Sequence, residues 1–145
     1  MRHNLLTRSE ILSTCKNAAR GAGFSWGMAS EAAIATLALI EADRDGFGCL
    51  IEILDHAQDK PHPLNIKDGA PICGLTLGVY LADMGEQPTT LPDGIVGAQM
   101  VSTFIEELPK GAKRPDAFPQ KLLDYVECVL VPESELSRRQ GAGEG

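Results

Sequence analysis

Aromatic residues are scarce in this sequence, which has four Phe, two Tyr and one Trp among its 145 residues. A core must therefore be built from Ala, Leu, Ile and Val, and such small side chains let helices pack closely. The hydrophobic share of 43% is ordinary for a folded protein and excludes wholesale disorder. We expect one globular domain over residues 1–140, followed by a flexible Gly-rich tail at 141–145.

Long apolar segments are also lacking. The apolar run at 32–40 is far shorter than the roughly 20 residues that a membrane-spanning helix needs. The segment 1–9 is polar and no apolar segment follows it directly, unlike a secretory signal peptide. The sequence therefore predicts a soluble, cytoplasmic protein that does not bind membranes.

Closely spaced thiols and metal ligands are absent as well. The nearest candidate ligands, His56, His62 and Cys73, match no zinc spacing. Cys49 and His56 would share a helix face, but apolar neighbours raise the pKa of a thiol and make it unreactive. The glycines form no nucleotide-binding motif. We therefore expect no metal, no cofactor and no catalytic residue, and free, buried thiols at Cys15, Cys49, Cys73 and Cys128.

Positive charge is in short supply, because the formal net charge is -7. An acidic protein is repelled by a phosphate backbone, so nucleic acid is not an expected partner. The first 30 residues are the exception, with four basic residues against Glu10 alone, a local balance of +3. That region, which includes Lys16 and Arg20, suits a small anion or an acidic partner; the alternative is a solvated helix flank.

The sequence does contain helical periodicity, which predicts a mainly α fold. Thr7 and Glu10 have the spacing of a capping box for a helix over 8–20. Ser25 is placed to cap a second helix over about 26–42. Because the middle of that helix carries no charge, we expect it to be the central, buried helix of one compact domain. Further apolar stripes predict helices at 47–54, 95–108 and 122–130.

Residues 72–81 fit two structures. Apolar residues alternate there with small or polar ones, which favours a strand. Pro71 is placed at the first position of a helix, which favours the helical alternative. We predict a helix, and the alternative is an α+β fold with a short strand or hairpin in this segment.

A glycine-bearing corner joins the first two predicted helices. Glycine supplies the left-handed backbone that closes a helix, and the N-terminus of the next helix offers unpaired N–H groups and partial positive charge. With nearby cations, such a corner suits a phosphate or carboxylate. The alternative is a tight helix–helix corner with the Trp packed as an anchor. The candidate ligand-binding residues are Lys16, Arg20, Gly21, Gly23, Ser25 and Trp26.

Two blocks carry a family resemblance. The first block, AARGAGFSWG at 18–27, leads into the predicted Ala-rich helix. The second block, VPESELSRRQGAG at 131–143, follows the last predicted helix. Together they resemble the two ends of a family of small bacterial proteins known as a domain of unknown function, and PICGLTLG at 71–78 is a looser match. The chain is shorter than that pattern before its last helix. The resemblance implies a domain but no activity, cofactor or catalytic residue.

Two hypotheses about function follow. The first is a non-catalytic binding or accessory module that forms a homo-oligomer or binds a protein partner. The second is a small enzyme or ligand-binding protein that holds an anionic group at the Arg20/Ser25 helix corner.

Overall fold

The computed structural model describes residues 4–59, 72–86, 88, 90–91 and 93–130. This part of the chain is mainly helical, as the periodicity predicts, and includes one small parallel sheet of two strands. The helices are α1 (Arg8–Gly21), α2 (Trp26–Glu41), α3 (Gly46–Asp59), α4 (Gly74–Met84), α5 (Gln99–Ile105) and α6 (Gln120–Leu130); the strands are β1 (Ile72–Cys73) and β2 (Ile95–Val96).

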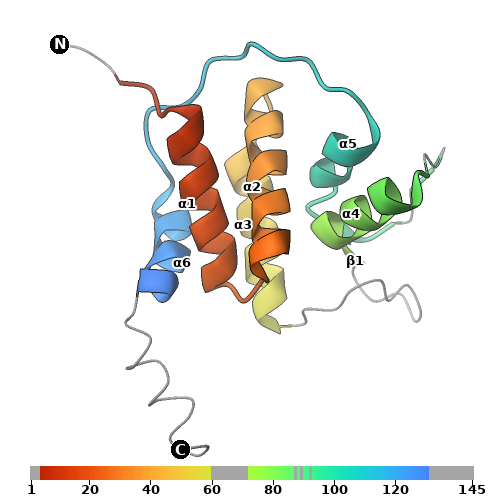
Figure 1. Cartoon of the computed structure of the whole chain (residues 1–145), viewed down its shortest axis with the longest axis horizontal. Coiled ribbons are helices and arrows are strands. Elements are labelled where there is room, and N and C mark those ends of the chain that lie inside the picture. Colours follow the sequence, from red (N-terminus) through yellow and green to blue (C-terminus); the bar gives the residue numbers. More distant parts are fainter. Residues whose placement is uncertain (1–3, 60–71, 87, 89, 92, 131–145) are drawn as a thin grey trace, which may run out of the picture.

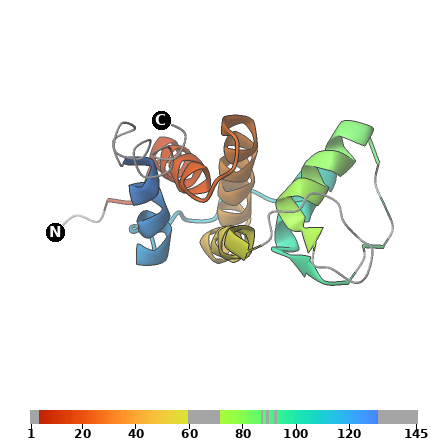
Figure 2. The same cartoon turned by 90° about the horizontal axis from the view of Figure 1, so that it is seen from below.

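Helix α1 lies between α6 and α2, and α3 lies behind α2 in the view of Figure 1, where it contacts both α2 and α6 (Figures 1 and 2). Helices α4 and α5 pack on each other at the other end of the molecule, beside the small sheet. Each of these helices contributes at least one fully buried apolar side chain to the core. One such residue from each, in chain order, is Ile11, Leu39, Leu50, Leu75, Met100 and Leu122.

The starts of α1 and α2 are set by local hydrogen bonds, as predicted. The Thr7 hydroxyl accepts from the Glu10 amide at 3.0 Å, and the Glu10 carboxylate accepts from the Thr7 amide at 2.8 Å. This reciprocal pair is the predicted capping box. The Ser25 hydroxyl accepts from the Met28 amide at 3.2 Å and caps α2.

The segment 72–81 contains both predicted structures, because a two-residue strand leads directly into α4. Ile72 and Cys73 pair in parallel with Ile95 and Val96. The helical prediction is confirmed for most of the segment. The strand adds only a short ladder that ties the start of α4 to the start of α5.

The predicted helix over 95–108 is wrong at both ends, since α5 covers only Gln99–Ile105. Gly94 and Gly97 have φ values of 79° and 66°, which a right-handed helix does not allow. A Cβ on Gly97 would lie 2.4 Å from Cγ1 of Ile53, so only glycine lets the chain pass α3 here. The apolar stripe is therefore shared by a strand, a turn and a shorter helix.

Helix α2 is the central, mostly buried helix that the sequence predicts, but it is not covered on every side. Most of the helix is buried, but the Ile34 side chain is 59% exposed and Trp26 is 51% exposed. The reason is tertiary: α1, α3 and α5 cover the other sides of α2, and within the described residues the side bearing Ile34 is open. An apolar helix face therefore meets solvent.

No helix in the described ranges is both long enough and apolar enough to cross a membrane.

Asp55 links α3 to α6. Its carboxylate accepts from Tyr125 Oη at 2.6 Å and from Lys121 Nζ at 2.5 Å. Burial raises the pKa of Asp55, but the hydrogen bonds from Lys121 and Tyr125 outweigh it, so the pKa lies below its usual value. The link therefore contributes stability when Asp55 is ionised.

We expect Asp55→Asn to lower the free energy of unfolding by about 1 kcal/mol or less at neutral pH, because both ion-pair partners are partly exposed. Since the folded-state pKa is the lower one, this stability is present above the unfolded pKa of about 3.9 and is lost as pH falls through the folded pKa. Urea unfolding of both proteins at pH 7 and in acid measures the difference. Asp116→Asn, at an exposed carboxylate, is the control; an equal effect there would contradict the assignment.

Candidate functional site

The predicted corner between α1 and α2 depends on its glycines for two different reasons. Gly23 has a φ of 110°, a left-handed conformation that turns the chain between the helices. Gly21 is the last residue of α1 and faces α6, where a Cβ would lie 1.9 Å from the carbonyl oxygen of Tyr125. Both glycines therefore shape the backbone, and Ser25 caps α2.

Three candidate side chains meet at this corner. The Arg20 guanidinium carbon lies 4.7 Å from the centre of the Trp26 ring, and Lys16 Nζ lies 5.5 Å from it. Both cations are within the range of a cation–π interaction. Because the ring is half exposed, the corner presents two positive charges beside an accessible aromatic surface. We name Lys16, Arg20 and Trp26 the basic corner.

Arg20 also serves the structure of the corner. Its Nη1 donates to the carbonyl oxygen of Phe24 at 2.7 Å, which fastens the turn before α2. Its Nε is buried and has no hydrogen-bond partner within the described part of the chain. The predicted helix–helix corner is thus present, although Trp26 is half exposed rather than packed as an anchor. Binding of an anion there stays a prediction.

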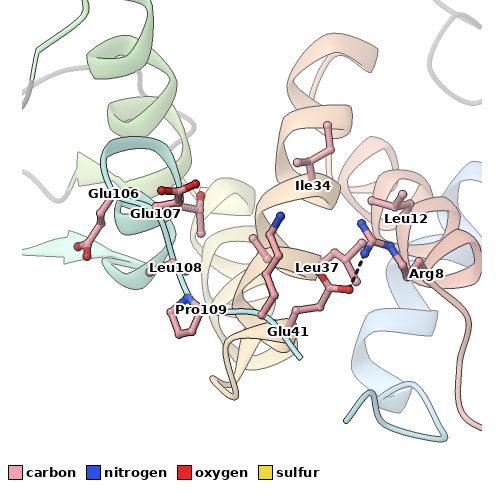
Figure 3. A pocket seen from close by; sticks show the side chains of 12 residues that line it. Arg8, Leu12, Ile34, Leu37, Glu41, Glu106, Glu107, Leu108 and Pro109 are labelled. Carbon is pink, nitrogen blue, oxygen red and sulfur yellow. Dashed lines mark hydrogen bonds and ion pairs between the residues drawn. The ribbon is translucent and has the colours of Figure 1, made fainter. Parts of the chain in front are cut away.

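Sequence reasoning missed a groove of about 310 Å³ at the other end of α1 and α2. Arg8 and Leu12 line one wall, the segment 106–110 lines the other, and side chains of α2 lie between them (Figure 3). The exposed Ile34 lies at this groove. The complete lining is Arg8, Leu12, Ile34, Leu37, Ala38, Glu41, Thr103, Glu106, Glu107, Leu108, Pro109 and Lys110.

A buried carboxylate stands at the end of the groove. Glu41 has a side chain that is only 10% exposed, and its Oε2 accepts from Arg8 Nη1 at 2.9 Å. A carboxylate this buried needs a charged or hydrogen-bonding partner, and Arg8 supplies one from α1. Glu106 and Glu107, both exposed, add negative charge to the opposite wall. Lys110 stands on the same wall, so the groove combines an apolar floor with a wall of mixed charge that is net negative.

The basic corner and the groove belong to one surface, which we name the α1–α2 face. Side chains four residues apart on a helix follow one another along it. On α1, residues at this spacing extend from Arg8 at the groove to Arg20 at the basic corner. Helix α2 lies beside α1 and runs in the opposite direction (Figure 1). The face is basic and aromatic at the corner, apolar around Ile34 with exposed Glu31 one turn before it, and net negative at the groove wall, where Glu106 and Glu107 outnumber Lys110. Its members are Arg8, Leu12, Lys16, Arg20, Trp26, Ile34, Leu37, Ala38, Glu41, Glu106 and Glu107.

Two of the buried cysteines, Cys15 and Cys49, have thiols with a raised pKa. Cys49 is buried, and burial raises the pKa of its thiol to about 11, as expected from its apolar neighbours. Burial likewise raises the pKa of Cys15 to about 12. All four cysteines are free, but Cys128 is exposed, so the prediction of a buried thiol is wrong there.

Of the three residues weighed as metal ligands, His56 and Cys73 lie within the described part of the chain. The described residues contain no group of three or more His, Cys, Asp or Glu side chains placed to hold a metal ion. His62 lies outside the described residues, as do the predicted tail at 141–145 and the block at 131–143.

Fold and site together define a small, mainly helical domain with one open face of mixed charge and apolar character. Residues 6–79, half of the chain, match the family described as "Protein of unknown function (DUF3726)", and the chain belongs to this family. No curated protein and no solved structure matches the chain. The matched segment contains the basic corner and every α1 and α2 residue of the groove, whereas the wall at 106–110 lies beyond it.

Proposed function

We propose that this protein is a non-catalytic binding module that holds a peptide segment of a protein partner on the α1–α2 face. The observation that carries the proposal is the exposure of Ile34 and Trp26 on one continuous face that ends in a groove. About half of each of these two apolar side chains is already in contact with water in the folded protein, so this half contributes little to the stability of the fold. Covering it with a partner would release that water and favour binding. Tryptophan is also the residue type most enriched at the energetic centres of protein interfaces.

The charges on the face favour a segment of defined direction. An acidic side chain of the partner would meet Lys16 and Arg20, and a basic one would meet Glu106 and Glu107. An apolar side chain between them would cover Ile34. Complementary charges of this kind select partners and orient them, while the apolar contact supplies most of the affinity.

The second hypothesis, a small anion held at the corner, has weaker support. Arg20 already directs Nη1 to a backbone carbonyl, and its Nε is turned into the protein. Lys16 and the remaining guanidinium edge are better matched to one carboxylate of a larger ligand that also covers Trp26. The same two cations therefore serve the first hypothesis as one end of an extended site.

Selection of binders from a library of displayed 12-residue peptides tests the proposal. We expect enriched peptides to share an acidic, then apolar, then basic order, because the face has the opposite order of charge. Ile34→Glu should weaken their binding by at least tenfold, since it places a charge where an apolar contact is needed. Titration calorimetry with the enriched peptides measures this.

Tyr80→Ala is the matched control, because Tyr80 is a 41% exposed aromatic residue on α4, away from the face. It should leave peptide affinity unchanged. Failure to enrich any peptide, together with stabilisation by phosphate or acetate that Lys16→Ala removes, would replace the proposal with the anion-binding hypothesis. Equal losses from Ile34→Glu and Tyr80→Ala would also reject the α1–α2 face as the site.

A further inference from the structure

We infer that the α1–α2 face binds a segment of this same chain, residues 133–139, which competes there with the partner. The inference rests on the proposed function, because it uses the same face. The segment follows α6 in the sequence and lies outside the described residues. Three properties support it: the order of its charges, the place where α6 ends and the length that it can span.

The sequence of the segment is complementary to the face. ESELSRR at 133–139 places two acidic residues first, then Leu136, then two arginines. The face presents the basic corner first, then Ile34, then the groove wall, where two glutamates and Lys110 leave a net negative charge. Each part of the segment therefore meets a part of the face with the opposite charge or with matching apolar character.

The end of α6 lies at the correct end of the face. Near the end of α1, a Cβ on Gly21 would contact the Tyr125 carbonyl and, at 3.2 Å, the Cβ of Cys128. The last turns of α6 therefore pack beside the α1–α2 connection, where the basic corner lies (Figure 1). A chain that continues from α6 reaches the basic corner before the groove, so the acidic residues of the segment arrive first.

The lengths agree as well. From Trp26 to Glu41, α2 rises about 22 Å at 1.5 Å per residue. An extended chain covers about 20 Å between residues 133 and 139, and about 10 Å between residues 130 and 133. The second distance is about the diameter of one helix, which is enough to pass the end of α1. A segment tethered this closely has an effective concentration in the millimolar range, so a weak contact suffices.

The single tryptophan makes the contact measurable in the 145-residue chain. Trp26 is the only Trp in the sequence, so quenching of its fluorescence by acrylamide reports access to this face. We expect Leu136→Asp to raise the quenching constant at least twofold and Gln140→Asp, just beyond the segment, to leave it unchanged. Leu136→Asp should also tighten binding of the library-selected peptides severalfold, because the competitor is weakened.

A charge exchange tests the direction of the segment. Lys16→Glu and Glu135→Lys should each raise the quenching constant, and the two together should restore it, because the double variant pairs the same charges in reverse. Additive effects in the double variant would overturn the inference. Circular dichroism melting of each variant confirms that the fold is retained.

The other occupants give different results. If protection of Trp26 appears only as the protein dimerises in sedimentation experiments, the occupant belongs to a second copy and the intramolecular contact is rejected. If Leu136→Asp changes nothing while library-selected peptides still bind and protect Trp26, the proposed function stands and this inference fails. If the peptides also fail to bind, both are rejected.

Discussion

Leu39→Ala should lower the free energy of unfolding by about 2–5 kcal/mol, whereas Ile34→Ala on the same helix should change it by less than about 0.5 kcal/mol. Leu39 is fully buried, so truncation leaves a cavity in the core. Ile34 is 59% exposed, and truncation removes mostly solvated surface. Urea unfolding followed by circular dichroism gives both values. The contrast measures directly which side of α2 the fold covers.

The Ile34→Ala result has a second use. A variant that keeps its stability but loses peptide binding shows that the residue is retained for contact with a ligand rather than for the core. If Ile34→Ala proves as destabilising as Leu39→Ala, Ile34 is packed into the core and not merely covered by a weak, competing contact. The α1–α2 face would then be part of the core, and the proposed binding surface would be excluded.

Gly21→Ala should destabilise the protein by about 1–3 kcal/mol, although helix propensity alone favours alanine over glycine by about 1 kcal/mol. The cause is a backbone contact: the new Cβ would lie 1.9 Å from the Tyr125 carbonyl oxygen. A carbonyl within α6 cannot move aside as a flexible side chain can. Helices α1 and α6 must therefore separate, and the buried Leu122 would be expected to lose part of its packing.

Gly27→Ala is the matched control for Gly21→Ala. Gly27 lies in the first turn of α2, and a Cβ there would meet no heavy atom within 4 Å. Alanine at this position should leave stability unchanged or raise it by up to about 1 kcal/mol. Thermal unfolding of the two variants compares the same Gly→Ala substitution at a tightly packed position and at one with free space around the new Cβ. A stabilised Gly21→Ala variant would contradict the contact between α1 and α6.

The starts of the first two helices and the position of the corner could be predicted from sequence because they depend on local interactions. The Thr7–Glu10 capping box and the Ser25 cap form between residues three apart in the chain. The left-handed turn at Gly23 is equally local. Lys16 and Arg20 share a helix flank by spacing alone. Their meeting with Trp26 follows from the short connection between α1 and α2.

The bounds of the helix within residues 95–108 could be found only from the tertiary structure. Ile95 and Val96 pair with a strand far away in the sequence. Gly97 has a left-handed backbone conformation, and Ile53 of α3 leaves no space there for a Cβ, so both features require glycine. Apolar periodicity reports that residues are buried, but it does not distinguish a helix from a strand that packs on one.

Only the tertiary structure decided where the candidate binding surface lies. The sequence by itself determined that residues 32–40 of α2 carry no charge and that this helix is central and largely buried. Which side stays open depends on where α1, α3 and α5 pack and on the course of the segment 106–110 past the helix. These are contacts between residues distant in sequence, and no local pattern encodes them. The open side, with Ile34 at its centre, is the surface on which the proposed function depends.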